Sequence, residues 1–312
     1  MGTLYIDRNN LSLQFDQQTL VIYENECLLN RIPLIAIDRI FIYGDTNINS
    51  KLINKLAENK IGLIFIGGRT KEPRMFFNSP HNDAKIRLSQ YRLHLDSDFR
   101  IKFSQALIKD KITTQLELIQ NFRLKINTDY TKYTEKFEQL EQLLESVNYA
   151  TSINSIMGYE GAASSIYFDC IKNILPLDLR FKSRNRRPPK DPFNSIISLG
   201  YTLLHSEAVL EIYSRGLDPF IGFMHEIDYS RESLACDIIE PLRYIIDKLA
   251  LDLFLEFKLD ESLFSIQANG ACWMNKTARG IFFKAYQDIQ DKIHFQLNHH
   301  LNDVREIVKA YG

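Results

Sequence analysis

Four side chains in the second half of the chain could bind a hard divalent cation: Glu160, His225, Asp237 and Glu240. Carboxylate oxygens suit Mg²⁺ or Mn²⁺, and a single imidazole moves the preference toward Mn²⁺. A structural zinc site would require cysteine ligands, but the four cysteines of the chain have no C-x-x-C spacing. If the stretches that carry these four residues converge, the expected chemistry is a metal-assisted reaction at phosphates.

Glu160 lies among small residues, in the run GYEGAA at 158–163. Asn154-Ser155 could cap a helix over 156–167, and each of the two glycines in the run would cost about 1 kcal/mol relative to alanine inside that helix. This cost predicts that another backbone or a ligand comes close. The alternative is a tightly packed helix crossing in which Glu160 points to solvent.

His225 ends an apolar run, and a lone histidine in such a place is commonly a core residue with satisfied hydrogen bonds. The helix predicted to follow, with Asp228 or Ser230 as its cap, makes His225 more interesting. Asp237 and Glu240 are three residues apart on that helix and therefore share one face. Two such carboxylates either form an exposed acidic face or require a neutralising partner.

The neighbours of these two acids favour burial, because the helix expected over 231–246 is apolar nearly all round. Buried carboxylates need partners, and Arg231, Arg243 or a metal ion are the candidates. Pro241 removes the backbone hydrogen bond to the carbonyl of Asp237, so the helix is expected to kink between the two acids.

A basic segment over 180–190 separates the Glu160 stretch from the His225 stretch, with six basic residues in eleven and no acidic one. Pro188-Pro189 stiffens this segment, and an apolar helix follows it, so we expect the segment to be held against the domain. An enzyme that acts on nucleic acid needs a fixed basic segment beside a metal site, because phosphate contacts position the strand.

The elements that must position these residues change in kind along the chain. Strands are predicted at 3–7, 11–15 and 19–23 as an antiparallel meander, then at 27–30, 34–43, 62–66 and 74–77, with a helix at 50–59. From about residue 83 the apolar residues recur at helical spacing. The fold class is therefore α+β, with a small β-rich N-terminal domain (1–78), a linker (79–83) and a large all-α catalytic domain (84–312).

The composition limits how the chain could meet its partners. A net charge of −1 over 312 residues argues against coating nucleic acid through global charge, so any contact must come from a local patch. No stretch approaches the roughly 18 consecutive apolar residues of a membrane span. The cysteine pattern and the absence of a signal sequence predict reduced thiols in a cytoplasmic protein.

Taken in order, these segments resemble the successive signatures of the CRISPR-associated integrase family, the catalytic subunit of spacer acquisition (Cas1). The signatures are GYEGAA with Tyr167, RPPKDPFN at 187–194 with Gly200-Tyr201, LDP at 217–219 with GFMH at 222–225, and SLACDIIEPLR at 233–243. Each motif alone is weak, whereas their order and spacing together are specific. The β-then-α domain order extends the resemblance over nearly the whole chain.

The resemblance implies a prokaryotic, metal-dependent DNA integrase and endonuclease of antiviral defence. Such an enzyme joins the 3′ hydroxyl ends of a captured DNA fragment into the repeat of a CRISPR array. The resemblance also implies Mg²⁺ or Mn²⁺ held by Glu160, His225 and Glu240, with Asp237 close by. Some members of the family use aspartate as the third ligand, so Asp237 stays an alternative to Glu240.

The partners implied by the resemblance are double-stranded DNA, a second copy of the chain, and a small ferredoxin-like subunit (Cas2). The homodimer is expected to form through the N-terminal domain. Arg231 and Arg243 are expected either to pair with the acids or to touch DNA. The other contacts to phosphates are assigned to four residues of the basic segment: Arg184, Arg186, Arg187 and Lys190.

Two other functions fit the same residues. A stand-alone metal-dependent nuclease in repair or recombination would share the site but release cleaved ends. A non-catalytic DNA-binding scaffold would use the acids only to pin helices together. In that case, replacing Glu160 or His225 would unfold the chain or leave its DNA binding unchanged.

Overall fold

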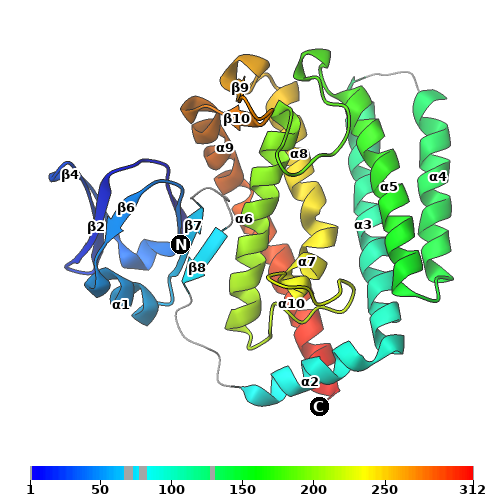
Figure 1. The fold of residues 1–312 in the computed structure, drawn as a ribbon, viewed down its shortest axis with the longest axis horizontal. Coiled ribbons are helices and arrows are strands. Elements are labelled where there is room, and N and C mark those ends of the chain that lie inside the picture. Colours follow the sequence, from blue (N-terminus) through cyan, green and yellow to red (C-terminus); the bar gives the residue numbers. More distant parts are fainter. Residues whose placement is uncertain (1, 67–72, 77–82, 127–130, 312) are drawn as a thin grey trace. The chain divides into compact units, whose positions relative to one another are not determined.

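The computed structural model describes residues 2–66, 73–76, 83–126 and 131–311. The chain divides into two compact units, Met1–Asn82 and Asp83–Gly312. The boundary between the units falls inside the segment expected to be a linker, of which 79–82 lie outside the described residues. The α+β fold class is confirmed, because the strands of the first unit are followed by a mostly helical second unit (Figure 1).

The described residues of the first unit form two sheets. One has the strand order β1-β5-β7-β8, in which β1, β5 and β7 are parallel and β8 is antiparallel to β7. The other has the order β4-β3-β2-β6. The strands are β1 (Gly2–Ile6), β2 (Leu11–Asp16), β3 (Thr19–Glu24), β4 (Cys27–Pro33), β5 (Ile37–Ile42), β6 (Thr46–Ile48), β7 (Gly62–Ile66) and β8 (Pro73–Phe76).

The antiparallel meander predicted from 3–7, 11–15 and 19–23 is correct for β2 and β3 but wrong for β1. The strand expected at 27–30 is β4, which pairs antiparallel with β3. β1 pairs in parallel with β5 in the other sheet. Parallel strands must be joined by a long connection, so they are distant in sequence. A prediction that pairs each strand with the next one in the chain therefore misses them. Helix α1 (Ser50–Glu58) forms where expected, capped by Asn49, and buries Leu52 and Leu56 in the core of this unit.

The second unit is built from helices, with α3, α4 and α5 lying side by side (Figure 1). The helices are α2 (Ala84–Leu95), α3 (Ser97–Ile126), α4 (Thr131–Asn148), α5 (Ile153–Ile174), α6 (Pro192–Ser214), α7 (Ser233–Ile239), α8 (Arg243–Leu255), α9 (Lys276–Asp288) and α10 (Gln290–Ala310). Three single 3₁₀ turns occur at η2 (Leu177–Leu179), η3 (Glu240–Leu242) and η4 (Glu261–Leu263). The all-α expectation needs one correction, since β9 (Phe264–Ile266) and β10 (Cys272–Met274) form a hairpin.

The expected interruption near Pro241 is confirmed, and its form is a 3₁₀ turn, η3, between α7 and α8. The helix does not begin as predicted, however. It starts at Ser233 after Glu232, whose side chain makes no cap hydrogen bond, so neither Asp228 nor Ser230 caps it. The break places Glu240 on the short turn, where its direction no longer follows the helix that carries Asp237.

Helix α5 is capped by Ser152, two residues before the predicted Asn154, because the Ser152 hydroxyl accepts a hydrogen bond from the Ser155 N–H. The prediction that another backbone approaches the α5 glycines is wrong. A Cβ atom built on Gly158 or Gly161 would meet nothing within 4 Å among the described residues. These glycines leave open space beside Glu160.

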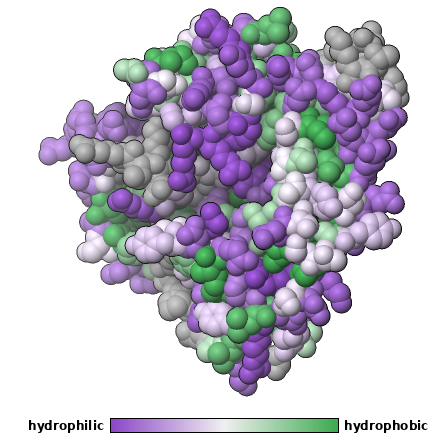
Figure 2. All heavy atoms as spheres, turned by 45° about the vertical axis from the view of Figure 1, so that its right-hand side comes forward, coloured by the Kyte–Doolittle hydropathy of each residue, from purple (hydrophilic) through white to green (hydrophobic). Residues whose placement is uncertain are grey.

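No helix in the described part of the chain is long and apolar enough to cross a membrane. Figure 2 shows one face of the molecule, on which hydrophilic residues predominate and hydrophobic residues gather only in small groups.

Candidate active site

Asp237 organises the segment that carries His225. Its side chain is fully buried, and its Oδ2 accepts the backbone N–H groups of Phe223 (2.6 Å) and Met224 (3.0 Å). Its Oδ1 accepts the backbone N–H of His225 (3.0 Å) and lies 2.7 Å from Nδ1 of the same residue. Since both carboxylate oxygens are engaged, Asp237 acts as a scaffold for the loop.

Gly222 makes this arrangement possible. A Cβ atom at this position would lie 2.7 Å from Oδ2 of Asp237 and 2.7 Å from the backbone carbon of Ser233. Such contacts are shorter than real Cβ atoms show, so only glycine lets the loop close around the carboxylate.

Helices α2 and α3 hold the same loop from its other side. The Gln90 amide donates to the carbonyls of Asp218 (2.8 Å) and Ile221 (2.7 Å). Nδ1 of His94 lies 2.7 Å from the Gly222 carbonyl oxygen, and Arg100 donates through Nε to the carbonyl of Phe223 (2.9 Å). The loop that carries His225 is therefore held by contacts from three separate helices, and the His225 ring itself contacts Asp237.

Glu160 and Glu240 meet at one cation, the ammonium of Lys111 on α3. This ammonium forms an ion pair with Oε1 of Glu160 on α5 and lies 2.6 Å from Oε2 of Glu240 on η3. The other oxygen of Glu240 lies 3.0 Å from the Arg243 guanidinium. Ser164, one turn beyond Glu160, donates to its Oε1 (2.8 Å). Glu160 is the more open of the two acids, with 26% of its side chain exposed against 7% for Glu240.

The charges around Glu240 decide its ionisation. Burial raises the pKa of Glu240, but the Arg243 guanidinium and the Lys111 ammonium, helped by the nearby His225, hold it well below its usual range. In the same way, burial lowers the pKa of Arg243, and Glu240 more than offsets this effect and raises it. Glu240 is therefore a buried carboxylate that stays charged.

A second buried acid, Asp247 on α8, lies behind this cluster. The hydroxyl of Tyr201 donates to Asp247 Oδ1 (2.5 Å), and that of Tyr167 donates to Oδ2 (2.8 Å). Burial raises the pKa of Asp247 to about 6, although the two tyrosine hydroxyls oppose the shift. The Tyr201 ring in turn lies against two guanidinium groups, of Arg243 at 4.7 Å and of Arg184 at 5.4 Å.

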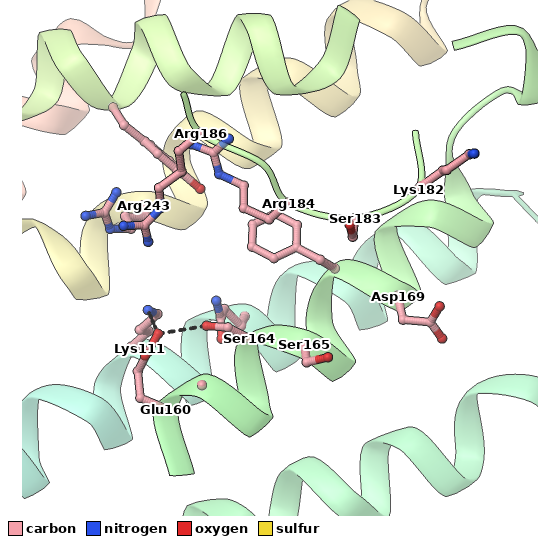
Figure 3. Close-up of a pocket in the computed structure, with 14 residues that line it drawn as sticks. Lys111, Glu160, Ser164, Ser165, Asp169, Lys182, Ser183, Arg184, Arg186 and Arg243 are labelled. Atoms are coloured by element: carbon pink, nitrogen blue, oxygen red, sulfur yellow. Dashed lines mark hydrogen bonds and ion pairs between the residues drawn. The ribbon is translucent and has the colours of Figure 1, made fainter. Parts of the chain in front are cut away.

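Lys111, Glu160, Tyr201 and Arg243 are among the residues that line a pocket of about 510 Å³, whereas Glu240, His225 and Asp247 are not. Figure 3 shows Lys111, Glu160, Ser164 and Ser165 along one wall, from α3 and α5, with the basic segment and Arg243 facing them across the space. The lining residues are Lys111, Gln115, Glu160, Gly161, Ser164, Ser165, Phe168, Asp169, Lys182, Ser183, Arg184, Arg186, Tyr201 and Arg243. Acidic and basic groups thus face each other across an open cavity.

The structure brings together some of the residues singled out from the sequence. Glu160 and Glu240 share Lys111, and His225 lies near enough to Glu240 to act on its charge. Asp237 is linked to Glu160 and Glu240 only through His225, because both of its oxygens face the loop. Arg243 pairs with Glu240, which is one of the two roles expected for it.

The basic segment is held against its domain, as predicted, although its residues differ in place. Arg184 donates to the side chains of Asn194 (2.8 Å) and Ser198 (3.2 Å), and burial lowers its pKa. Arg186 lines the pocket. Arg187 and Lys190 are exposed and are not among the lining residues, and Arg231 lies 3.5 Å from Asp228.

Lys111, Ser164 and Asp247 were missed by reasoning from sequence. Lys111 and Gln115 lie on the same stripe of α3 as the buried Ile108 and Ile119, and both are themselves buried. A lysine and a glutamine on an otherwise apolar stripe is a signal that could have directed attention to this helix.

The candidate donors for Mg²⁺ or Mn²⁺ are the carboxylates of Glu160 and Glu240 and the imidazole of His225. Among the described residues, no group of three histidine, cysteine or acidic side chains lies close enough to hold a metal ion. The chemistry of the donors nevertheless suits such an ion, because two carboxylates already enclose a cation and the imidazole is oriented by a carboxylate at Nδ1. The donors therefore fit the ion in type, while Lys111 stands between them.

Sequence comparison adds independent information. A profile described as "CRISPR associated protein Cas1" matches residues 4–288. A CRISPR-associated endonuclease Cas1 of Thermodesulfovibrio yellowstonii is 35% identical, over 92% of this chain and 91% of the relative. A second, from Thermus thermophilus, is 29% identical over 81% of this chain and 74% of the relative.

Solved structures share the fold. A Cas1 protein from Thermotoga maritima superposes with a TM-score of 0.84 at 21% identity, covering 99% of this chain and 97% of that one. A casposase bound to an integration product gives 0.83 at 21% identity, with coverages of 100% and 90%. A chain of a Cas6-RT-Cas1–Cas2 complex superposes with a TM-score of 0.76 at 23% identity. The match covers 96% of this chain and 35% of the longer one.

Proposed function

The chain belongs to the CRISPR-associated protein Cas1 family, and on that premise we propose that it inserts captured DNA fragments into a CRISPR array by metal-dependent phosphodiester exchange. One observation carries the proposal most. Glu160 and Glu240 converge on a single cation at the edge of a pocket whose opposite wall is basic. One proposed metal ligand, Glu160, and bases that can hold phosphates thus line one cavity, and Lys111 links that cavity to Glu240.

In this proposal, Glu160, Glu240 and the free ring nitrogen of His225 would hold the metal ion. A bound Mg²⁺ or Mn²⁺ would supply Lewis-acid stabilisation of the charge that develops on the reacting phosphate. Asp237 would not be a ligand. It would hold the imidazole through Nδ1, which is how carboxylates commonly orient metal-binding histidines.

The basic wall would position the DNA backbone. Arg186 lines the pocket without a role in the buried acid cluster, so it is the first candidate for a phosphate contact. Arg243 is committed to Glu240, and Arg184 to Asn194, so both would act mainly by setting the local field. The direct roles expected for Arg187, Lys190 and Arg231 would require DNA that extends beyond the pocket.

The exchange balances without an external energy source. The 3′ hydroxyl oxygen of the fragment would form a bond to a phosphorus of the repeat. At the same time the bond between that phosphorus and the 3′ oxygen of the preceding repeat nucleotide would break. The attacking hydroxyl loses one proton, and the leaving 3′ oxygen takes one up. The protein's contribution would be in-line orientation of the hydroxyl and stabilisation of charge on the phosphate.

The partners follow from the family. A solved relative is a Cas1–Cas2 complex and another holds an integration product, and we propose the corresponding partners here: DNA, a Cas2 subunit and a second copy of this chain. Within the first unit, β4 lies at the edge of its sheet with Leu28 54% and Leu29 47% exposed, so this edge is our candidate for the homodimer contact.

The experiment is an integration assay with fragment, repeat duplex, partner subunit and Mn²⁺. We expect joined products from the wild type and none from Glu160→Gln or His225→Gln, with DNA binding retained by both variants. Strand transfer retained by either variant would overturn the metal-site proposal. Variants that unfold, or wild-type protein that binds DNA without joining it, would favour a scaffold.

A stand-alone nuclease remains the second candidate, because the curated relatives are named endonucleases. The same assay separates the two activities. Hydrolysed repeat or fragment without any joined product, in the presence of the partner subunit, would favour the nuclease.

A further inference from the structure

Lys111 is the cation that both site carboxylates share. Its ammonium pairs with Glu160 and lies 2.6 Å from Oε2 of Glu240, and only 7% of its side chain is exposed. Glu160 and Glu240 come from separate elements, α5 and η3. Without a cation between them, the two carboxylates would repel each other.

The cluster is electrically balanced before any metal ion enters. Two carboxylates, Glu160 and Glu240, face two cations, Lys111 and Arg243. A divalent ion added to this set would therefore leave an excess of positive charge, which DNA phosphates could neutralise.

Lys111 and Arg243 differ in how firmly they are held. The Arg243 guanidinium is stacked against the Tyr201 ring as well as paired with Glu240. Lys111 is a compact charge on a flexible stem, and it lines the open pocket beside the partly exposed Glu160. Both cations line the pocket, but the Tyr201 ring holds the guanidinium in place, whereas the interactions described for the ammonium are those with the two carboxylates.

We infer that Lys111 is a placeholder cation, which neutralises Glu160 and Glu240 in the metal-free protein and swings into the pocket when a divalent ion binds them. This inference rests on the proposed function, since it presumes that the two acids are metal ligands. In the pocket the ammonium joins Arg186 on the phosphate-binding side. Metal binding and phosphate binding therefore assist each other, and DNA raises the affinity for the ion.

The direct test is Mn²⁺ affinity in the absence of DNA, measured by electron paramagnetic resonance of the free ion. We expect Lys111→Met to bind Mn²⁺ about tenfold more tightly than the wild type, because the competing charge is gone. Lys109→Met is the matched control. It removes the same charge from the same helix, but its ammonium donates to Asn148 (2.8 Å), and its affinity should equal that of the wild type.

An Mn²⁺ affinity of Lys111→Met equal to or weaker than that of Lys109→Met would overturn the inference. A failure of the proposed function has a different signature, because then the wild type itself would not bind Mn²⁺. A further measurement is Mn²⁺ affinity in the presence of DNA whose fragment lacks the 3′ hydroxyl. This DNA should tighten Mn²⁺ binding by the wild type more than by Lys111→Met.

A measurement on the wild type covers the case in which Lys111→Met does not fold. Reductive methylation with formaldehyde and cyanoborohydride, read by peptide mass spectrometry, reports how accessible each lysine amine is. We expect saturating Mn²⁺ to raise the labelling of Lys111 severalfold while that of Lys109 stays constant. Equal labelling of Lys111 with and without bound Mn²⁺ would contradict the release of its ammonium.

Discussion

Asp237 and Glu240 are two buried acids three residues apart, yet their surroundings differ completely. Asp237 is held by three backbone N–H groups and the His225 ring, all from one loop. Glu240 is held by two side-chain cations, Lys111 and Arg243. Backbone donors cannot leave without unfolding the loop, whereas a side-chain cation can move.

Two acids only three residues apart can face separate partners when a turn lies between them. The 3₁₀ turn at Pro241 turns Glu240 away from the helix that carries Asp237. One acid then faces the loop, where it orients a histidine, and the other faces α3, where it can exchange partners. The following substitutions test that separation.

The largest expected effect is on activity. Glu240→Gln should lower the rate of strand transfer by about a hundredfold to a thousandfold, because it removes one proposed ligand with little change of shape. The rate of appearance of joined DNA measures this. A Glu240→Gln enzyme with a near-normal rate would show that this acid is structural, as Asp237 is.

The second effect is on stability, where replacing Asp237 should cost more than replacing Glu240. Asp237→Asn should lower the free energy of unfolding by about 3 kcal/mol, because its amide nitrogen would face backbone donors in a buried site. Glu240→Gln should lower the free energy of unfolding by about 1 kcal/mol. In that variant Lys111 still pairs with Glu160, and Arg243 still packs against the Tyr201 ring. Urea unfolding measures both free energies. Equal losses for the two variants would show that the two acids do not differ in their structural role.

Gly222→Ala should destabilise the loop by about 2 kcal/mol, because the new Cβ atom would overlap Asp237 and Ser233. Gly158→Ala is the matched control within a helix. It meets nothing within 4 Å among the described residues and should stabilise the protein by up to about 1 kcal/mol. Thermal unfolding of the two variants should therefore shift in opposite directions, and a tolerated Gly222→Ala would argue against a tightly closed loop.

Asp247 provides a smaller effect that depends on pH. Burial raises its pKa to about 6, so the folded state binds the proton more tightly than the unfolded state does. Its contribution to stability is therefore present at low pH and is lost as the pH rises through about 4 to 6. Asp247→Asn should lack this loss, so its stability relative to the wild type should improve between pH 4 and pH 7. A constant difference across that range would contradict the shift.

The smallest effect concerns DNA affinity. Arg186→Ala should weaken binding of a repeat duplex by about threefold to tenfold, the loss of one positioned phosphate contact. Arg187→Ala changes the adjacent exposed arginine, which does not line the pocket, and should have less effect. Fluorescence anisotropy at fixed salt measures both variants, and equal losses would place the backbone outside the pocket.

Much of this arrangement could be predicted from the sequence, because it depends on local patterns. Most strands of the first unit, the α+β order, the interruption at Pro241 and the gathering of Glu160 with Glu240 follow from periodicity, proline chemistry and ordered motifs. Strands β6, β9 and β10 were not predicted. The parallel pairing of β1 with β5 and the contact of Lys111 with both acids join residues far apart in the chain. Only the folded chain shows such contacts.

The position of Asp237 shows the same limit. Its spacing from Glu240 makes the two acids equivalent candidates, and the sequence alone left both open. What distinguishes them is the loop after Gly222, which closes around Asp237 and uses both of its oxygens. Hydrogen-bond donors supplied by a backbone leave no signature in residue types.

The anomalous scattering of Mn²⁺ in crystals of the protein tests the division of labour between the two acids most directly. We predict one Mn²⁺ peak bound by Glu160, Glu240 and Nε2 of His225, with Asp237 still bonded to Nδ1 of His225. A peak with Asp237 among its ligands and Glu240 still paired with Lys111 would contradict it.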